Sequence, residues 1–207
     1  NPSWGIRQAG TALARIENPR INMALSFNHR GLNISHTEDL DKVAAQEKVN
    51  ALASEGEKIY EIIVSTLNVP NTLRVGVRFW FMAPADSLED ADRFLCKGIE
   101  SPLLTAILGI TKAEIRDAAV AYVVEDSETG FRRRVGLDTI VRTTIEAPDA
   151  TGLASDQGEG FVVVDVDTFT RPPSDHFPNS RAFVQNSYLQ SLSIATDLFG
   201  WLGKHQK

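Results

Sequence analysis

Apolar and polar residues alternate along several stretches of the chain with the two-residue period of half-buried β-strands. In residues 73–81, apolar side chains alternate with Arg, Gly, Arg and Trp. A second long alternation covers residues 131–145. Residues 161–169 place valines on one face and aspartates on the other. Each of these three segments is therefore predicted to be a strand that turns one face toward a core.

Two further segments indicate hairpins. Residues 21–27 and 32–35 alternate on either side of an Asn-His-Arg-Gly turn at residues 28–31. Residues 114–125 are ambiguous, because residues 111–114 could cap a helix while residues 118–124 alternate like a strand. We interpret this last segment as a strand, because the turn at 126–130 and the alternation that follows make a hairpin the simpler structure.

Helical patterns separate these strands. The Ser-x-x-Glu spacing from Ser35 to Glu38 predicts a capping box and a helix that continues to about Leu67, while weak periodicity at residues 54–57 leaves a break open. Shorter helices are predicted to start at Ser87 and at Ser101, which precedes a proline. A final helix is predicted over residues 180–202, where apolar residues recur at helical spacing.

This order of elements does not alternate strictly between strand and helix, which argues against a doubly wound parallel sheet. The expected fold is α+β, with a mainly antiparallel sheet and two long helices packed on one of its faces. We expect one domain over residues 1–207. Residues 147–160, which contain one Pro, three Gly and two Asp, are predicted to form a mobile loop, either a lid or a disordered excursion.

The other face of this sheet holds the candidate binding residues, and we call it the Arg–Trp face. Alternation assigns to it Arg74, Arg78, Trp80, Arg132, Arg134, Asp165 and Asp167, together with Asp138 and Arg142. Gly76 and Gly136 are predicted to leave shallow hollows beside the guanidiniums. Arginine and aspartate on neighbouring strands can form an ordinary ion-paired sheet surface. Alternatively, the arginines can bind planar anions through paired hydrogen bonds. Both interpretations remain open at this point.

Composition narrows the choice of partner and compartment. The chain has 207 residues and a formal net charge of -6, which argues against nucleic acid as the partner. The single cysteine, Cys96, cannot form an intramolecular disulfide, so a cytoplasmic location is expected. No apolar run approaches the roughly 20 residues of a membrane-spanning helix, so no membrane partner is expected.

Motifs of nucleotide binding, metal binding and nucleophilic catalysis were not found in the sequence. No catalytic residue, metal ligand or cofactor is therefore assigned. The leading hypothesis is a binding or interaction module that uses the Arg–Trp face for a protein partner or a small anionic ligand. A homodimer is a further candidate assembly. The alternative hypothesis is an enzyme, of unassigned reaction, with a cleft between the Arg–Trp face and residues 147–160.

Two strand motifs carry a family resemblance. Residues 73–79, Leu-Arg-Val-Gly-Val-Arg-Phe, and residues 163–169, Val-Val-Asp-Val-Asp-Thr-Phe, resemble those of a sporadically distributed, uncharacterised bacterial protein family. Its members carry an Arg-hydrophobic-Gly-Leu-Arg-Tyr strand and a later hydrophobic-Asp-hydrophobic-Asp strand. In this chain Val77 replaces the Leu, and Phe79 replaces the Tyr. The resemblance covers most of the chain and implies a bacterial protein of similar element order, but it implies no reaction.

Overall fold

The computed structural model describes the chain in segments, which are residues 5–9, 13–18, 23–28, 31–36, 42–67, 75–99, 106, 109–110, 119–142, 159–170 and 180–206. Contacts within the chain divide it into two compact units, residues Asn1–Val69 with Asn179–Gln185, and Pro70–Pro178 with Asn186–Lys207. The expected single domain over residues 1–207 stays a prediction. The predicted start of a helix at Ser101 lies outside the described residues. Residues 147–158 of the predicted loop also lie outside them.

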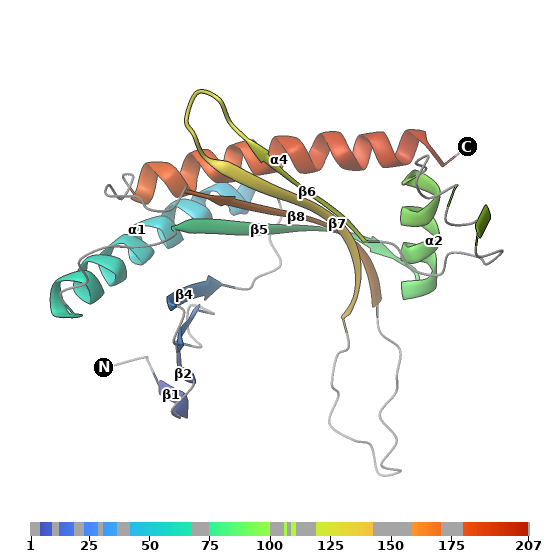
Figure 1. Ribbon diagram of the computed structural model, residues 1–207. Helices are drawn as coiled ribbons and strands as arrows, with labels where there is room; N and C mark the ends of the chain where they lie inside the picture. Colours follow the sequence, from blue (N-terminus) through green and yellow to red (C-terminus); the bar gives the residue numbers. More distant parts are fainter. Residues whose placement is uncertain are drawn as a thin grey trace, which may run out of the picture. The chain divides into compact units, whose positions relative to one another are not determined.

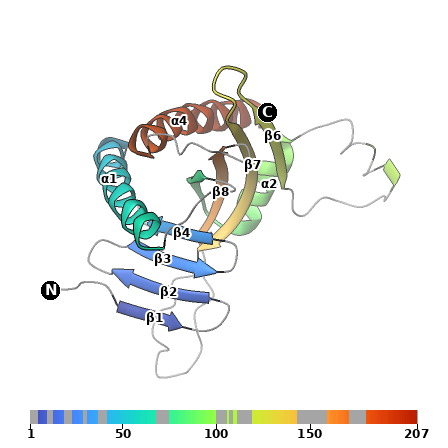
Figure 2. The same ribbon diagram turned by 60° about the vertical axis from the view of Figure 1, so that its left-hand side comes forward.

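The first unit contains an antiparallel sheet with strands in chain order, β1 (Gly5–Ala9), β2 (Leu13–Asn18), β3 (Met23–Asn28) and β4 (Gly31–His36) (Figure 2). The predicted hairpin is confirmed, since β3 pairs with β4. The sequence did not predict β1 and β2, whose alternation is short. Ser35 is a strand residue opposite Ala24 instead of a helix cap, so the predicted helix start there is wrong.

Helix α1 (Lys42–Leu67) follows β4 in the first unit. It is one continuous helix, and the weak periodicity at residues 54–57 does not break it. Ala45, Val49 and Ala53 are buried at four-residue spacing, which puts them on one helix face. On a more polar part of α1, Asn50 Oδ1 accepts a 2.9 Å hydrogen bond from the side-chain amide of Gln185, which belongs to the first turns of the last helix.

The second unit contains a four-stranded antiparallel sheet in the order β5-β8-β7-β6, where β5 is Gly76–Ala85, β6 is Val120–Glu125, β7 is Arg132–Arg142 and β8 is Glu159–Phe169. The predicted hairpin of β6 and β7 is confirmed. Its turn depends on Asp126, whose Oδ1 accepts hydrogen bonds from the backbone N–H groups of Glu128 and Thr129, both at 3.0 Å. Gly130 closes the turn with φ of 68°, a left-handed conformation that glycine adopts without steric cost.

Helices α2 (Leu88–Gly98) and α4 (Ser180–Lys204) pack on one face of this sheet, and Figure 1 shows α4 extending along the strands. The Tyr188 ring on α4 lies 5.4 Å from Phe79 and 6.4 Å from Phe81, measured between ring centroids. Farther along α4, Ala195 packs with Val164 and Val166 of β8. The architecture is therefore α+β.

Two helices of the second unit pack on this sheet, and the expected pair of long helices is not confirmed. One is long, α4, and the other is the short α2, whose Leu95 packs with Val162 and Leu202. Packing of α1 on this sheet is not confirmed, because α1 belongs to the first unit. The strands also form two four-stranded sheets where one was expected. Strand alternation indicates which residues are buried, but it does not indicate which strands pair.

The start of α2 lies directly against β8. Ser87 caps the helix as its sequence pattern predicted, since its Oγ accepts a 3.1 Å hydrogen bond from the Asp90 N–H. The Ser87 backbone passes so close to Gly160 that a Cβ on Gly160 would lie 2.1 Å from the Ser87 carbonyl oxygen. Glycine at this strand position therefore permits the close approach of helix and sheet.

We predict that Gly160→Ala destabilises the protein by about 1–3 kcal/mol, because a new methyl group would displace backbone atoms at the cap of α2. Gly200→Ala is the matched control, since a Cβ at that position of α4 would have no other atom within 4 Å. It should stabilise the protein by roughly 0.5–1 kcal/mol through helix propensity. Urea unfolding of both variants measures the two effects, and equal stability of the two variants would contradict this packing.

Candidate functional site

The strand register brings four of the predicted site residues together at the centre of the Arg–Trp face. Asp165 of β8 lies directly opposite Trp80 of β5 on one side and Gly136 of β7 on the other. Arg78 and Arg134 both lie opposite the next residue of that face, Asp167. Residues directly opposite in an antiparallel sheet share a face, so these side chains point to the same side.

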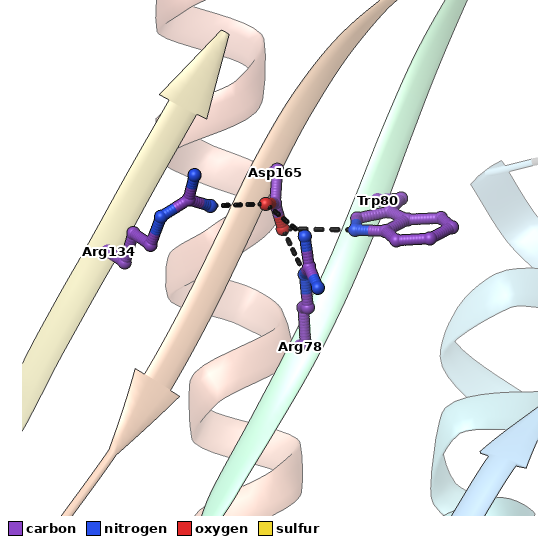
Figure 3. A network of polar contacts seen from close by, with 4 residues as sticks. All are labelled: Arg78, Trp80, Arg134 and Asp165. Carbon is purple, nitrogen blue, oxygen red and sulfur yellow. Dashed lines mark hydrogen bonds and ion pairs between the residues drawn. The ribbon is translucent and has the colours of Figure 1, made fainter. Parts of the chain in front are cut away.

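Asp165 is the hub of the contacts in this group (Figure 3). Arg78 donates from Nε to Oδ1 at 2.7 Å and from Nη2 to Oδ2 at 2.6 Å, which is a bidentate pair. Arg134 Nη1 donates to Oδ2 at 2.6 Å. The Trp80 indole N–H donates to Oδ1 at 3.0 Å. One carboxylate therefore fixes the positions of two guanidiniums and one indole ring.

Burial and neighbouring positive charges shift the pKa of the Asp165 carboxylate in opposite directions. The Asp165 side chain is 9% exposed, and this burial by itself would raise its pKa. The hydrogen bonds and positive charges of Arg78 and then Arg134 outweigh that effect, so the pKa of Asp165 lies below its usual value. Conversely, the hydrogen bond to Asp165 raises the pKa of Arg78. Both shifts favour the ionised forms of Asp165 and Arg78.

The other three predicted site residues are Arg132, Asp167 and Arg74. Arg132 shares the face, but its Nε donates to Glu125 of β6 at 3.2 Å, away from Asp165. Asp167 lies between Arg78 and Arg134 in the register and contributes to the raised pKa of Arg78. Arg74 lies outside the described residues. The centre of the face thus combines two arginines with two aspartates.

The predicted hollow at Gly136 is filled by a neighbouring side chain. Arg134 reaches diagonally to Asp165, and a Cβ on Gly136 would lie 3.4 Å from the Arg134 Nη1. The Arg134 guanidinium therefore occupies the space beside Gly136, and this position does not leave a depression for a ligand. At Gly76, a Cβ would lie 3.1 Å from the Phe169 Cβ, so this position is closely packed as well.

Two exposed apolar side chains lie side by side along β5 on this face, Trp80 and Met82, and the second was not predicted from the sequence. Trp80 is 57% exposed even though its N–H is bonded, and the Arg78 guanidinium lies 5.0 Å from the ring centroid. Met82, two residues farther along the same face, is also exposed. It was missed because only residues 73–81 of this strand were assigned to the two faces of the sheet. The alternation itself continues through Met82 and could have indicated it.

Two hollows open near the end of β5, away from the Asp165 hub. One is lined by Pro84, Ala85, Asp86 and Glu159, and the other extends from there to Asp90 and Phe94 on α2. Within the described residues, His, Cys, Asp and Glu form no cluster that could hold a metal ion. The proposed cleft of the enzyme hypothesis would involve residues 147–160, most of which are not described, so that hypothesis stays a prediction.

Comparisons with protein-family models, with curated proteins and with solved structures find no match to this chain. The resemblance to a bacterial family therefore stays a prediction that rests on the two strand motifs. Among the described residues, no helix is both long and apolar enough to cross a membrane.

We predict that Asp165→Asn lowers the free energy of unfolding by about 1–3 kcal/mol at pH 7, because charge-assisted hydrogen bonds from two guanidiniums are weakened. The folded-state pKa of Asp165 is lowered, so its contribution is complete above the ordinary carboxyl pKa of about 3.9. The contribution is lost as pH falls through the folded-state pKa. Denaturant unfolding should show a constant difference from wild type between about pH 7 and 5, and a smaller one below about pH 4.

The control for this measurement is Asp138→Asn, which changes an exposed carboxylate on the same face. It should alter the stability by less than about 0.5 kcal/mol, as expected for an exposed surface substitution. An Asp165→Asn variant as stable as wild type at pH 7 would show that the carboxylate does not organise the site.

Proposed function

We propose that this chain is a protein-binding module whose contact surface is the Arg–Trp face, centred on Trp80. The observation that carries the proposal is an exposed tryptophan held in place by a buried carboxylate. Trp80 exposes more than half of its surface, while its polar N–H is already bonded to Asp165. Partner binding would therefore cover apolar ring surface without leaving the indole N–H unpaired.

Preorganisation favours this role. A partner that contacts a freely rotating side chain must restrict it, at about 0.5–1.5 kcal/mol for each flexible group. The indole of Trp80 and the guanidiniums of Arg78 and Arg134 are already oriented by Asp165. Tryptophan and arginine are also the residue types that most often dominate the energy of protein interfaces. Met82 extends the exposed apolar surface on the same strand.

The charge balance favours a protein over a small anion. Arg78 and Arg134 both donate to Asp165, and Asp167 lies between them in the register. Two positive and two negative groups at the centre give little net attraction for an anion. The guanidiniums still have N–H groups beyond those that contact Asp165, and these can donate to backbone carbonyls of a partner. This pattern suits a broad interface with mixed polar and apolar contacts.

We predict that Trp80→Ala weakens partner binding roughly 50-fold. The exposed ring offers about 100 Å² of apolar surface, equivalent to about 2.5 kcal/mol when it is buried. The matched control is Trp201→Ala, which removes another exposed tryptophan, 42% exposed, from α4. Affinity capture from extracts of the source cells, with quantitative mass spectrometry, should identify proteins retained by wild type and Trp201→Ala but lost with Trp80→Ala. Calorimetry with the purified partner then gives the ratio of affinities.

Two outcomes would contradict the proposal. One is that Trp80→Ala, with an unchanged thermal melt, captures the same proteins as wild type at the same affinity. The other is that native mass spectrometry of the wild-type protein shows a retained small anion that Arg78→Ala loses. The second result would assign the Arg–Trp face to a small-molecule ligand.

A further inference from the structure

Strand β6 forms one edge of the sheet β5-β8-β7-β6, and Figure 2 shows it beyond β7. Its inner side pairs with β7 in continuous register from Val120 to Glu125, without a bulge. Among the described strands, none pairs with its outer side. An edge strand presents alternate backbone N–H and C=O groups that can pair with another strand.

The side chains of β6 are exposed on both faces of the sheet. Val123 lies opposite Arg134 on the Arg–Trp face and is 60% exposed, while Tyr122 and Val124 are exposed on the other face. Helix α4 packs on β5, β8 and β7 through residues such as Tyr188 and Ala195. The sequence Val-Ala-Tyr-Val-Val-Glu contains neither Lys nor Pro, the residues that commonly protect an edge strand from pairing.

We propose that β6 is a dimerisation edge, where the β6 of a second copy of this chain pairs antiparallel with it. A two-fold axis perpendicular to the sheet relates the copies. The β5-β8-β7-β6 sheet of one copy and that of the other then form one continuous sheet. This inference does not depend on the proposed function of the Arg–Trp face. It does imply that both copies present that face on the same side of the joined sheet.

The side-chain pattern selects the register and the direction of this pairing. With Tyr122 opposite its own copy, Val120 lies opposite Val124, and Ala121 lies opposite Val123. The pairs within residues 120–124 are therefore all apolar, and Glu125 lies at the end of the ladder opposite Ala119. A register centred on Val123 would move Glu125 inward, opposite Ala121 of β6. The register centred on Tyr122 is favoured because it keeps Glu125, the one charged residue of β6, at the end of the paired strands.

Charge also favours the antiparallel direction. The two Glu125 carboxylates lie at opposite ends of the antiparallel ladder, whereas in-register parallel strands would place them side by side, which is destabilising. Each Glu125 also retains its ion pair with Arg132 of its own chain, at 3.2 Å. A second copy therefore satisfies the backbone groups and the apolar side chains of this edge without an unpaired charge at the interface.

Sedimentation analysis of the full chain over protein concentrations from about 1 to 200 µM tests the proposal. Wild type is expected to reach twice the 22.7 kDa chain mass. Val123→Lys should shift the dissociation constant at least tenfold toward monomer, because it places a charge within the apolar ladder. The control Leu189→Lys changes a residue of α4 that is 52% exposed, and it should associate like wild type. Thermal melts establish that both variants are folded.

Cross-linking tests the register, in a Cys96→Ala background that removes the native thiol. Tyr122→Cys is expected to form an intermolecular disulfide on mild oxidation, since directly opposed residues have Cα atoms about 4.5–5.5 Å apart, within the range of a disulfide. Leu189→Cys should stay largely uncross-linked. A wild type that stays monomeric at all concentrations would overturn the proposal. A dimer that persists in Val123→Lys, or that Leu189→Cys cross-links as fast as Tyr122→Cys, would overturn it as well.

Discussion

A buried carboxylate in the middle of a sheet face is the constraint on which this account depends. An ionised aspartate with little exposure is costly unless hydrogen bonds and opposite charges compensate it. Asp165 receives that compensation from Arg78, Arg134 and Trp80, which come from the strands on its two sides. The requirement of one buried charge therefore determines the orientation of three larger and more exposed side chains.

The hydrophobic core on the other side of the sheet makes this arrangement possible. Phe79, Phe81, Val164 and Val166 alternate with the residues of the Arg–Trp face and pack against α4. A shift of one residue in any strand would move these apolar groups to the opposite face, so burial holds the register firmly. The same register places Asp165 opposite Trp80 and opposite Gly136. Core packing and the polar hub consequently support each other.

Sequence periodicity was sufficient to predict which residues share the Arg–Trp face. Arg78 and Trp80 alternate with apolar neighbours at a period of two, and the strand register confirms that they share a face with Arg134, Asp165 and Asp167. The hub itself could not be predicted. It depends on β8 lying between β5 and β7, a long-range pairing that local alternation does not encode. It also depends on diagonal contacts, since Arg78 and Arg134 lie opposite Asp167 but bond to Asp165.

Nuclear magnetic resonance of the Trp80 indole N–H tests the central claim most directly, with the signal assigned by comparison with Trp80→Phe. If Asp165 holds the ring, this proton should exchange with water more slowly in wild type than in Asp165→Asn, and its chemical shift should change between the two proteins. The indole of Trp201 on α4 should be unaffected. A Trp80 signal with the same shift and exchange rate in both proteins would show that the carboxylate does not position the tryptophan.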